Sequence, residues 1–218
     1  MKKILAVPVA FACLCVMSAA VLAQDQRPVE GTWVKQRART PKLEFYVQVI
    51  KHGEDRYAAD AIRVVKRSRR DVFQEIRGIG GMDVRVAPDD LLTITDANFD
   101  GRADLSIAYS DGGAGPNSTD QFYLANGKTG VFELHADLSA LPQVTINADR
   151  SITSSSRGGC CLNSSVTFRF VGGRLMMMAT TDQRLSGDGK SIVTRKGTVS
   201  DGKIHYTSHT RAAVEADR

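Results

Sequence analysis

The chain lacks the short sequence motifs that mark the commonest hydrolases and metalloenzymes. It contains no Gly-x-Ser-x-Gly nucleophile elbow, no His-Glu-x-x-His zinc site and no Cys-x-x-Cys pair. Histidine is scarce as well, with 4 in the chain. On one strand, His205 and His209 would lie roughly 13 Å apart, which is too far to share a metal ion. The sequence therefore predicts a protein that is not an enzyme.

Cysteine is nearly absent after the first 23 residues. The remainder of the chain contains only Cys160 and Cys161. No disulfide framework is expected from two neighbouring cysteines. Adjacent Cα atoms lie about 3.8 Å apart, below the usual disulfide range of about 4.4–6.8 Å, so a bridge between them would be strained. Two interpretations stay open: a pair of small buried thiols, or a vicinal disulfide that stiffens a tight loop.

Long apolar runs are missing except near the start of the chain. Lys2 and Lys3 precede an apolar run over residues 4–17, and Val21 and Ala23 place small residues three and one positions before Gln24. This pattern predicts a Sec signal peptide over residues 1–23. The apolar run is too short for a membrane anchor. We therefore expect a periplasmic or secreted protein without a membrane span.

A strong excess of charge is also absent. The formal net charge of +5 falls by two when Lys2 and Lys3 leave with the signal peptide. The basic run at residues 66–70 has no interleaved aromatic side chains on which bases could stack, so it is expected to be a solvated turn. Together with the predicted export and the lack of a membrane span, this argues against nucleic-acid binding, cytosolic metabolism and membrane transport.

Short strands and turns dominate what remains. Apolar and polar residues alternate over residues 43–49, 105–109, 166–170 and 203–207, as in half-buried strands. Asn126-Gly127, Gly172-Gly173, Gly187-Asp188-Gly189 and Asp201-Gly202 are typical hairpin turns. Only one helical turn is expected, around residues 137–141, because Pro142 ends it. We predict one all-β domain over residues 24–211, an antiparallel meander forming a β-sandwich, barrel or propeller-like fold, and a frayed tail over 212–218.

The segment 96–104 carries the strongest chemical signal. Oxygen-bearing side chains stand at positions 1, 3, 5 and 9 of this segment, and Gly101 stands at position 6. Calcium needs six to eight hard oxygen ligands, and alternate residues of a tightly wound loop can supply them. Position 12 is Ile107, so this is not an EF-hand. The predicted Ca²⁺ ligands are Asp96, Asn98, Asp100, the carbonyl of Arg102, and Asp104.

Two points about the calcium prediction stay open at this stage. Further ligands would come from water or from a distant carboxylate, with Asp111 and Asp120 as the nearest candidates. An Asx-rich turn without a metal ion is the alternative interpretation of the segment.

Two long connections are candidate binding surfaces, since loops held on a rigid scaffold often carry function. The first joins the strand after the calcium loop to the next strand and contributes Ser110, Asp111, Gly112 and Gly113. The second spans residues 154–163 and contributes Ser156, Arg157, Gly158, Gly159 and Asn163. Mobile connectors without a function are the alternative for both.

Several of these segments resemble one bacterial family. They are Asp-Ala-Asn-Phe-Asp-Gly-Arg-Ala-Asp-Leu (96–105), Asp-Gln-Phe-Tyr-Leu (120–124), Gly-Val-Phe (130–132), and the run from Ser156 through Cys160 and Cys161 to Phe170. The family comprises calcium-binding periplasmic proteins and includes immunity partners of lysozyme-like secreted effectors. It is more distantly similar to periplasmic inhibitors of invertebrate-type lysozymes. Where members commonly carry a tyrosine, this chain has Asn163.

The resemblance implies an all-β fold whose loops block the cleft of a glycan hydrolase. The leading hypothesis is therefore a non-enzymatic, calcium-binding periplasmic protein that binds and inhibits a lysozyme-like peptidoglycan hydrolase. A calcium-dependent adhesion or scaffold module of the integrin-like (FG-GAP) repeat kind is the first alternative. An enzyme acting on wall glycan is the second, and it would need two carboxylates about 5–10 Å apart in a groove.

Overall fold

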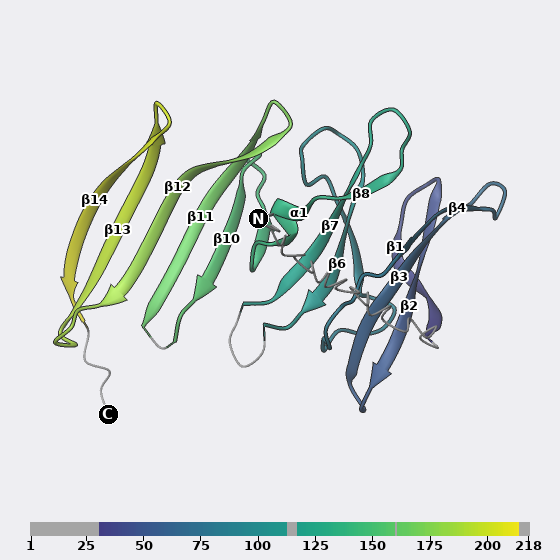
Figure 1. The fold of residues 1–218 in the computed structure, drawn as a ribbon, viewed down its shortest axis with the longest axis horizontal. Helices are drawn as coiled ribbons and strands as arrows, with labels where there is room; N and C mark the ends of the chain where they lie inside the picture. The colour runs from purple at the N-terminus through teal and green to yellow at the C-terminus, as the bar shows by residue number, and fades with distance from the viewer. Residues whose placement is uncertain (1–30, 113–116, 160, 214–218) are drawn as a thin grey trace, which may run out of the picture.

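The computed structural model describes residues 31–112, 117–159 and 161–213, and nearly all of them lie in strands or in the turns between strands. Within each sheet, strands that follow one another in the chain pair antiparallel, so the chain is a succession of meanders from one end of the molecule to the other (Figure 1). The all-β prediction is confirmed. The predictions for the signal peptide, Gly113 and Cys160 fall outside the described residues.

The strands form three open sheets, none of which closes into a barrel within the described residues. The first sheet contains β1 (Thr32–Arg39), β2 (Leu43–His52), β3 (Arg56–Lys66) and β4 (Val72–Arg77). The second contains β5 (Leu92–Thr95), β6 (Asp104–Ser110), β7 (Thr119–Ala125) and β8 (Phe132–Leu134). The third contains β9 (Val144–Ile146), β10 (Ile152–Arg157), β11 (Leu162–Val171), β12 (Arg174–Leu185), β13 (Ser191–Ser200) and β14 (Lys203–Ala212).

The first and second sheets share one hydrophobic core, as the two layers of a sandwich do. Alternate residues of β2 and β3 supply one side of it, because successive side chains of a strand point to opposite faces. Residues of β5, β6, β7 and β8 supply the other side. Phe45 is fully buried and meets Phe132 edge to face, with ring centroids 6.2 Å apart.

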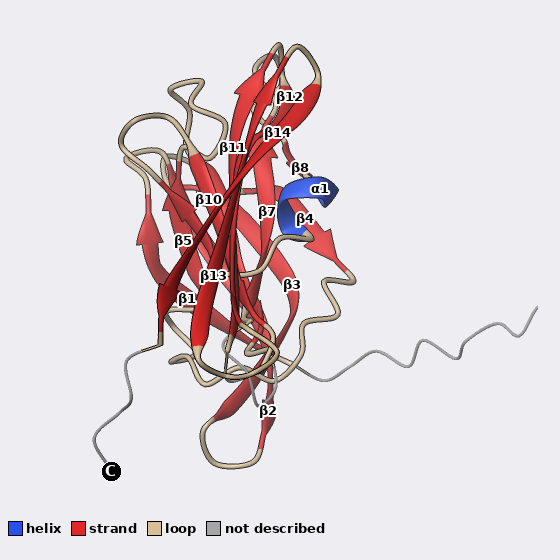
Figure 2. Ribbon diagram, turned by 90° about the vertical axis from the view of Figure 1, so that its left-hand side faces the viewer, coloured by secondary structure: helices blue, strands red, loops and turns tan. Residues whose placement is uncertain are grey.

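A second, smaller core joins the second sheet to the third. Ala97, Phe122, Leu138 and Ile152 are its buried members. Leu138 belongs to the single described helix, α1 (Ala136–Ser139), which begins where His135 Nδ1 accepts a hydrogen bond from Leu138 N. The helix was predicted over 137–141, so it begins one residue earlier and ends two residues earlier than expected. Figure 2 shows α1 beside the upright strands.

The outer strands of the third sheet extend away from both cores (Figure 1). Every residue of β14 is exposed, and no hydrophobic side chain of β12 to β14 is buried. Met176 is 48% exposed, although it lies within a run of three methionines at 176–178. These strands are held by their backbone pairing, with the tight turns at Gly172-Gly173 and Asp201-Gly202 in positive φ.

The remaining fold predictions can be compared directly. Residues 67–71 connect β3 to β4, which confirms the solvated basic turn. Ala212 belongs to β14, so the predicted frayed tail begins too early, and residues 214–218 lie outside the description. Within the described ranges, no helix has the length and apolar character needed to cross a membrane.

The two cores give a prediction for stability. Ile152 on β10 is fully buried, whereas Ile204 on β14 is 37% exposed. Ile152→Ala should lower the free energy of unfolding by about 2–5 kcal/mol, because it leaves a cavity in the second core. Ile204→Ala in the same sheet should cost less than about 1 kcal/mol. Urea denaturation measures both, and equal losses would contradict this assignment of the core.

Candidate functional site

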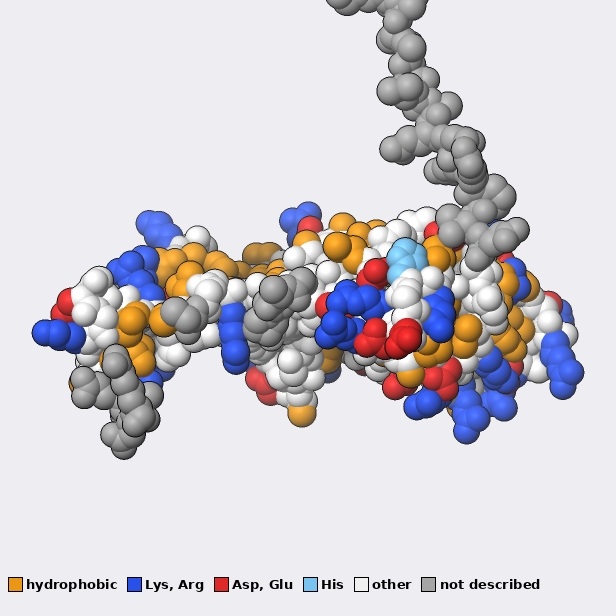
Figure 3. All heavy atoms as spheres, turned by 90° about the horizontal axis from the view of Figure 1, so that it is seen from below, with side chains coloured by type: hydrophobic (Ala, Val, Ile, Leu, Met, Phe, Trp, Pro, Cys, Tyr) orange, Lys and Arg blue, Asp and Glu red, His pale blue; other side chains and the backbone are white. Residues whose placement is uncertain are grey.

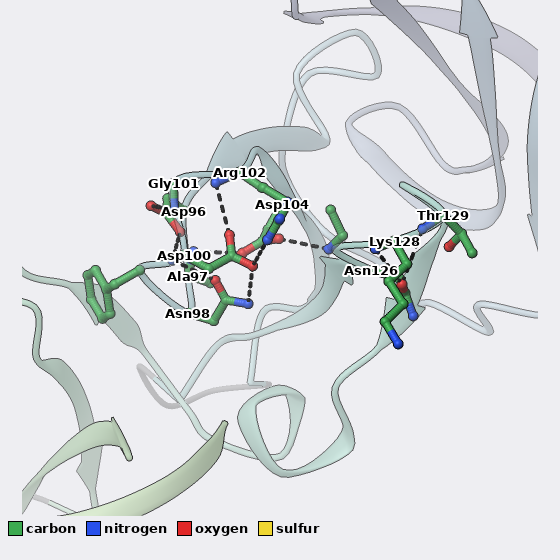
Figure 4. A network of polar contacts seen from close by, with 12 residues as sticks. Asp96, Ala97, Asn98, Asp100, Gly101, Arg102, Asp104, Asn126, Lys128 and Thr129 are labelled. Carbon is green, nitrogen blue, oxygen red and sulfur yellow. Dashed lines mark hydrogen bonds and ion pairs between the residues drawn. The ribbon is translucent and has the colours of Figure 1, made fainter. Parts of the chain in front are cut away.

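The predicted calcium loop, residues 96–104, forms a tight turn between β5 and β6. Phe99 and Gly101 adopt positive φ of 61° and 83°, which curls the backbone. The Asp96 carboxylate accepts hydrogen bonds from Asp100 N at 3.0 Å and Gly101 N at 2.9 Å. Asn98 Oδ1 accepts from Asp100 N at 3.1 Å. These side chains therefore point toward the inside of the loop (Figure 4).

Asp100 pairs with the residue that was expected to supply only a carbonyl. Its Oδ1 accepts from Arg102 N at 2.9 Å, and its Oδ2 lies 3.0 Å from the Arg102 guanidinium. Partial desolvation raises the pKa of Asp100, but the hydrogen bonds from Arg102 and Asn98 outweigh it, so this pKa lies below its ordinary value. The carboxylate is ionised and partly neutralised by its neighbour.

Asp104 is the buried member of the set, with no exposed surface. Its Oδ2 accepts from Ala97 N at 2.9 Å and its Oδ1 accepts from Ala125 N at 2.8 Å. Burial raises the pKa of Asp104 above its ordinary value, against the lowering effect of these two backbone donors, and the nearby charge of Asp100 raises it further. This carboxylate ties the loop to the end of β7.

The donors fit calcium in chemical type, since they are carboxylate and amide oxygens on a tightly wound loop. In the part of the chain that the structure describes, however, no three His, Cys, Asp or Glu side chains form a group that could hold a metal ion. The carboxylates instead accept backbone hydrogen bonds and contact Arg102, as in an Asx-rich turn. Calcium binding would require them to exchange some of these partners.

The two distant carboxylates suggested as further ligands have other contacts. Asp120 accepts a hydrogen bond from Ser106 Oγ at 3.0 Å. Asp111 accepts one from Arg85 N at 3.4 Å. Neither is hydrogen-bonded to the loop at 96–104 among the described contacts, so the structure does not join them to the predicted ligand set.

The two predicted binding loops are brought together by one asparagine. Asn117 Oδ1 accepts from Arg157 N at 2.9 Å, and Asn117 Nδ2 donates to Arg157 O at 3.0 Å. Asn117 precedes β7, and Arg157 ends β10, so this amide links the second sheet to the third. Sequence reasoning missed Asn117, whose contact with a residue 40 positions away leaves no local signal.

The bounds of the two predicted binding loops can be compared with the strands of the structure. The first connection was predicted to begin at Ser110, but Ser110 is the last residue of β6, and the connection lies between it and Thr119 of β7. Gly113 lies outside the described residues. The second connection is shorter than predicted, because β10 runs to Arg157 and β11 begins at Leu162. Ser156, Arg157 and Asn163 are therefore strand residues, and Arg157 is the register partner of Asn163.

Gly158 and Gly159 belong to the short turn that joins β10 to β11. Gly158 N donates to Leu162 O at 2.8 Å, and Gly159 has a φ of 77°, which favours glycine. Cys161 is exposed, which contradicts the alternative of two buried thiols for this residue. The vicinal disulfide involves Cys160, which lies outside the described residues.

A hollow of about 890 Å³ lies beside the first loop, and sequence reasoning missed most of it. Its lining combines Ser110 and Asp111, where β6 passes into that loop, with residues of two other segments, namely His52, Arg56, Gly81, Met82, Asp83 and Arg85. His52 Nδ1 lies 2.9 Å from Asp83 Oδ1, so these two side chains are paired in the lining of the hollow. Figure 3 views the molecule from below and shows a histidine among acidic and basic side chains.

The buried carboxylate of Asp104 generates a prediction about folding. Asp104→Ala leaves the N–H groups of Ala97 and Ala125 without their acceptor, and each unsatisfied buried group costs about 1–3 kcal/mol. The variant should therefore lose about 2–5 kcal/mol of unfolding free energy. Asp188→Ala, in the exposed β12–β13 turn, is the control and should change stability by less than about 1 kcal/mol. Equal unfolding midpoints in urea would contradict the structural role of Asp104.

Comparison with known proteins gives one structural match and no sequence match. No protein-family model and no curated protein sequence matches the chain. A solved structure described as a Xanthomonas type IV secretion system related protein is similar, with a TM-score of 0.59 and 13% sequence identity. The alignment covers 83% of this chain and 95% of that chain. At this identity the likeness shows a shared fold alone.

Proposed function

We propose that the protein is an exported, calcium-binding, non-enzymatic protein that binds and inhibits a lysozyme-like peptidoglycan hydrolase. The observation that carries the proposal is the pair of hydrogen bonds between Asn117 and Arg157. They hold the first loop and the β10–β11 turn against each other, so both can present one continuous contact surface. A protein inhibitor needs such a rigid protruding edge to enter a cleft.

Arg157 is the cation suited to that cleft. Its side chain is exposed, and no ion pair within the described residues involves it. Lysozyme-type clefts use a pair of carboxylates, and a guanidinium can bind a carboxylate with two parallel hydrogen bonds. The amide of Asn163, the register partner of Arg157, lies on the same face of the sheet and can replace hydrogen bonds to sugar.

Calcium would supply charge and rigidity to the segment from which the first loop starts. Asp96, Asn98, Asp100 and the Arg102 carbonyl would hold it, and the buried Asp104 lies at the end of the same turn. β6 begins at Asp104 and ends at Ser110, so order at the turn is transmitted along one short strand to the first loop.

The calcium proposal predicts a change in thermal stability. Binding in the range of about 0.1–1 mM or tighter should raise the melting temperature in excess calcium, because the ion binds only the folded state. Asp100→Ala should abolish this increase, whereas Asp188→Ala should retain it. Differential scanning calorimetry with calcium and with a chelator measures both. Identical melting curves for the unaltered protein would rule out the metal site.

Inhibition gives a second prediction. The protein should slow the clearing of peptidoglycan by a lysozyme-like hydrolase at near-stoichiometric ratio. Arg157→Ala should weaken binding to the hydrolase by about 1–3 kcal/mol, the range for a lost charge-assisted contact. Arg69→Ala, in the exposed basic turn between β3 and β4, is the matched control and should leave affinity unchanged. Titration calorimetry that showed the reverse order would place the interface elsewhere.

A hydrolase that acts on wall glycan is the second candidate function, and one observation favours it. Asp83 and Asp111 line the same hollow of about 890 Å³, beside His52 and Arg85. Paired carboxylates in a groove are what glycoside hydrolysis requires. Clearing of peptidoglycan by the purified protein alone, and its loss in Asp111→Asn, would support this candidate and reject inhibition.

A further inference from the structure

The strand register of the third sheet places one kind of side chain on one face. Arg157 of β10 pairs with Asn163 of β11, and the row continues across the sheet. The cross-strand partners in this row are Arg157, Asn163, Gln183, Thr194 and His209. Residues directly opposite each other in a sheet share a face. The row therefore crosses five strands without an acidic side chain.

The neighbouring rows have the same character. Moving two residues along each strand keeps the same face. The next row is Ser155, Ser165, Thr181, Lys196 and Thr207. The row after it is Thr153, Thr167, Ala179, Thr198 and His205. We call these three rows the polar face. It contains hydroxyls, amides, imidazoles and cations, and no Asp or Glu.

The polar face points to solvent, because the other face of the same strands meets the second core. Ile152 and Ser154 alternate with Thr153 on β10 and are 0% and 5% exposed. Phe168 and Phe170 of β11 pack against the second core from that side. The acidic residue of the paired strands also lies there, since Asp182 accepts a hydrogen bond from Ser164 Oγ at 2.7 Å. None of the residues of the polar face is buried.

The absence of acids distinguishes this surface from the first sheet. A surface that needs only solubility usually mixes both signs of charge. The first sheet does so, with ion pairs such as Lys35–Glu44 and Arg63–Glu75. On the polar face, Arg157 and Lys196 are the cations, and two hollows of about 420 and 400 Å³ meet at Gln183.

We propose that the polar face binds a carboxylate-bearing glycan, namely the peptidoglycan of the cell wall. Hydroxyls and amides can donate to and accept from sugar hydroxyls and N-acetyl groups, and the cations attract carboxylates. Five strands about 4.8 Å apart make the face roughly 19 Å wide, enough to bind an extended chain across the strands. This inference rests on the export assumed in the proposed function. Binding to peptidoglycan would keep the protein at the cell wall, where a wall hydrolase acts.

Sedimentation with purified peptidoglycan sacculi, without any hydrolase, tests the proposal. The full protein should bind sacculi, bind less at high salt because the attraction is screened, and not bind cellulose, a neutral glycan. Lys196→Glu should reduce the bound fraction by about tenfold, because it puts a like charge among the carboxylates. Arg184→Glu is the matched control: the same charge change on the opposite face of the sheet should reduce binding less than about twofold.

A second variant tests the hydrogen bonds at constant charge. Thr194→Val with Thr207→Val removes two hydroxyls of the polar face while keeping side-chain shape, and it should also reduce sacculus binding severalfold. Unchanged binding of this variant, or equal losses in Lys196→Glu and Arg184→Glu, would overturn the proposal. Circular dichroism checks that each variant retains the β structure.

Inhibition measured on a soluble chito-oligosaccharide separates this inference from the proposed function. Lys196→Glu should inhibit the hydrolase as well as the unaltered protein does, while losing the sacculi. If the variant loses inhibition as well, the polar face belongs to a protein interface and the glycan proposal is wrong. If the unaltered protein binds sacculi but inhibits no hydrolase, the proposed function fails and the glycan site is supported.

Discussion

The hydrogen bonds accepted by the buried carboxylate of Asp104 are the interaction on which the position of the loop at 96–104 depends. It accepts hydrogen bonds from Ala97 N and Ala125 N and has no exposed surface. Ala97 belongs to the second core, and Leu105, the next residue after Asp104, belongs to the first. One side chain therefore fixes the position of the loop at 96–104 between two cores that share no buried residue.

The loop at 96–104 is also stabilised by hydrogen bonds within the turn itself. Asp96, Asn98 and Asp100 satisfy the backbone donors of a turn that bends through positive φ at Phe99 and Gly101. The Arg150 guanidinium donates to Phe99 O at 2.7 Å, which connects the same turn to the third sheet. The loop is thus tied to the end of β7 and to the turn before β10, and any ion bound there would stabilise these connections.

The sequence was sufficient to predict most of the fold, because period-two alternation and hairpin glycines are local signals. The strands around Phe45, Ile107 and Phe168 and the turn at Gly172-Gly173 were found this way. The geometry of the candidate binding surface depends instead on contacts between residues that lie far apart in the sequence. Asn117 meets Arg157 only after β7 and β10 are placed, and nothing in the residues around either predicts it.

The polar face was hidden for a related reason, because it follows from register. β11 and β12 pair with an irregularity, so that Thr167 opposes Ala179 while Phe168 opposes Met177, and Met178 is the additional residue. Without the bulge, Leu175 would share the face of Thr181, because residues of one parity on an unbroken strand share a face. With it, Leu175 packs against the second core while Thr181 remains on the polar face. Met178 thus lets Leu175 face the core while Ala179 and Thr181 stay on the polar face. The three rows of this face then hold no acidic side chain and no apolar side chain larger than alanine, which suits glycan binding.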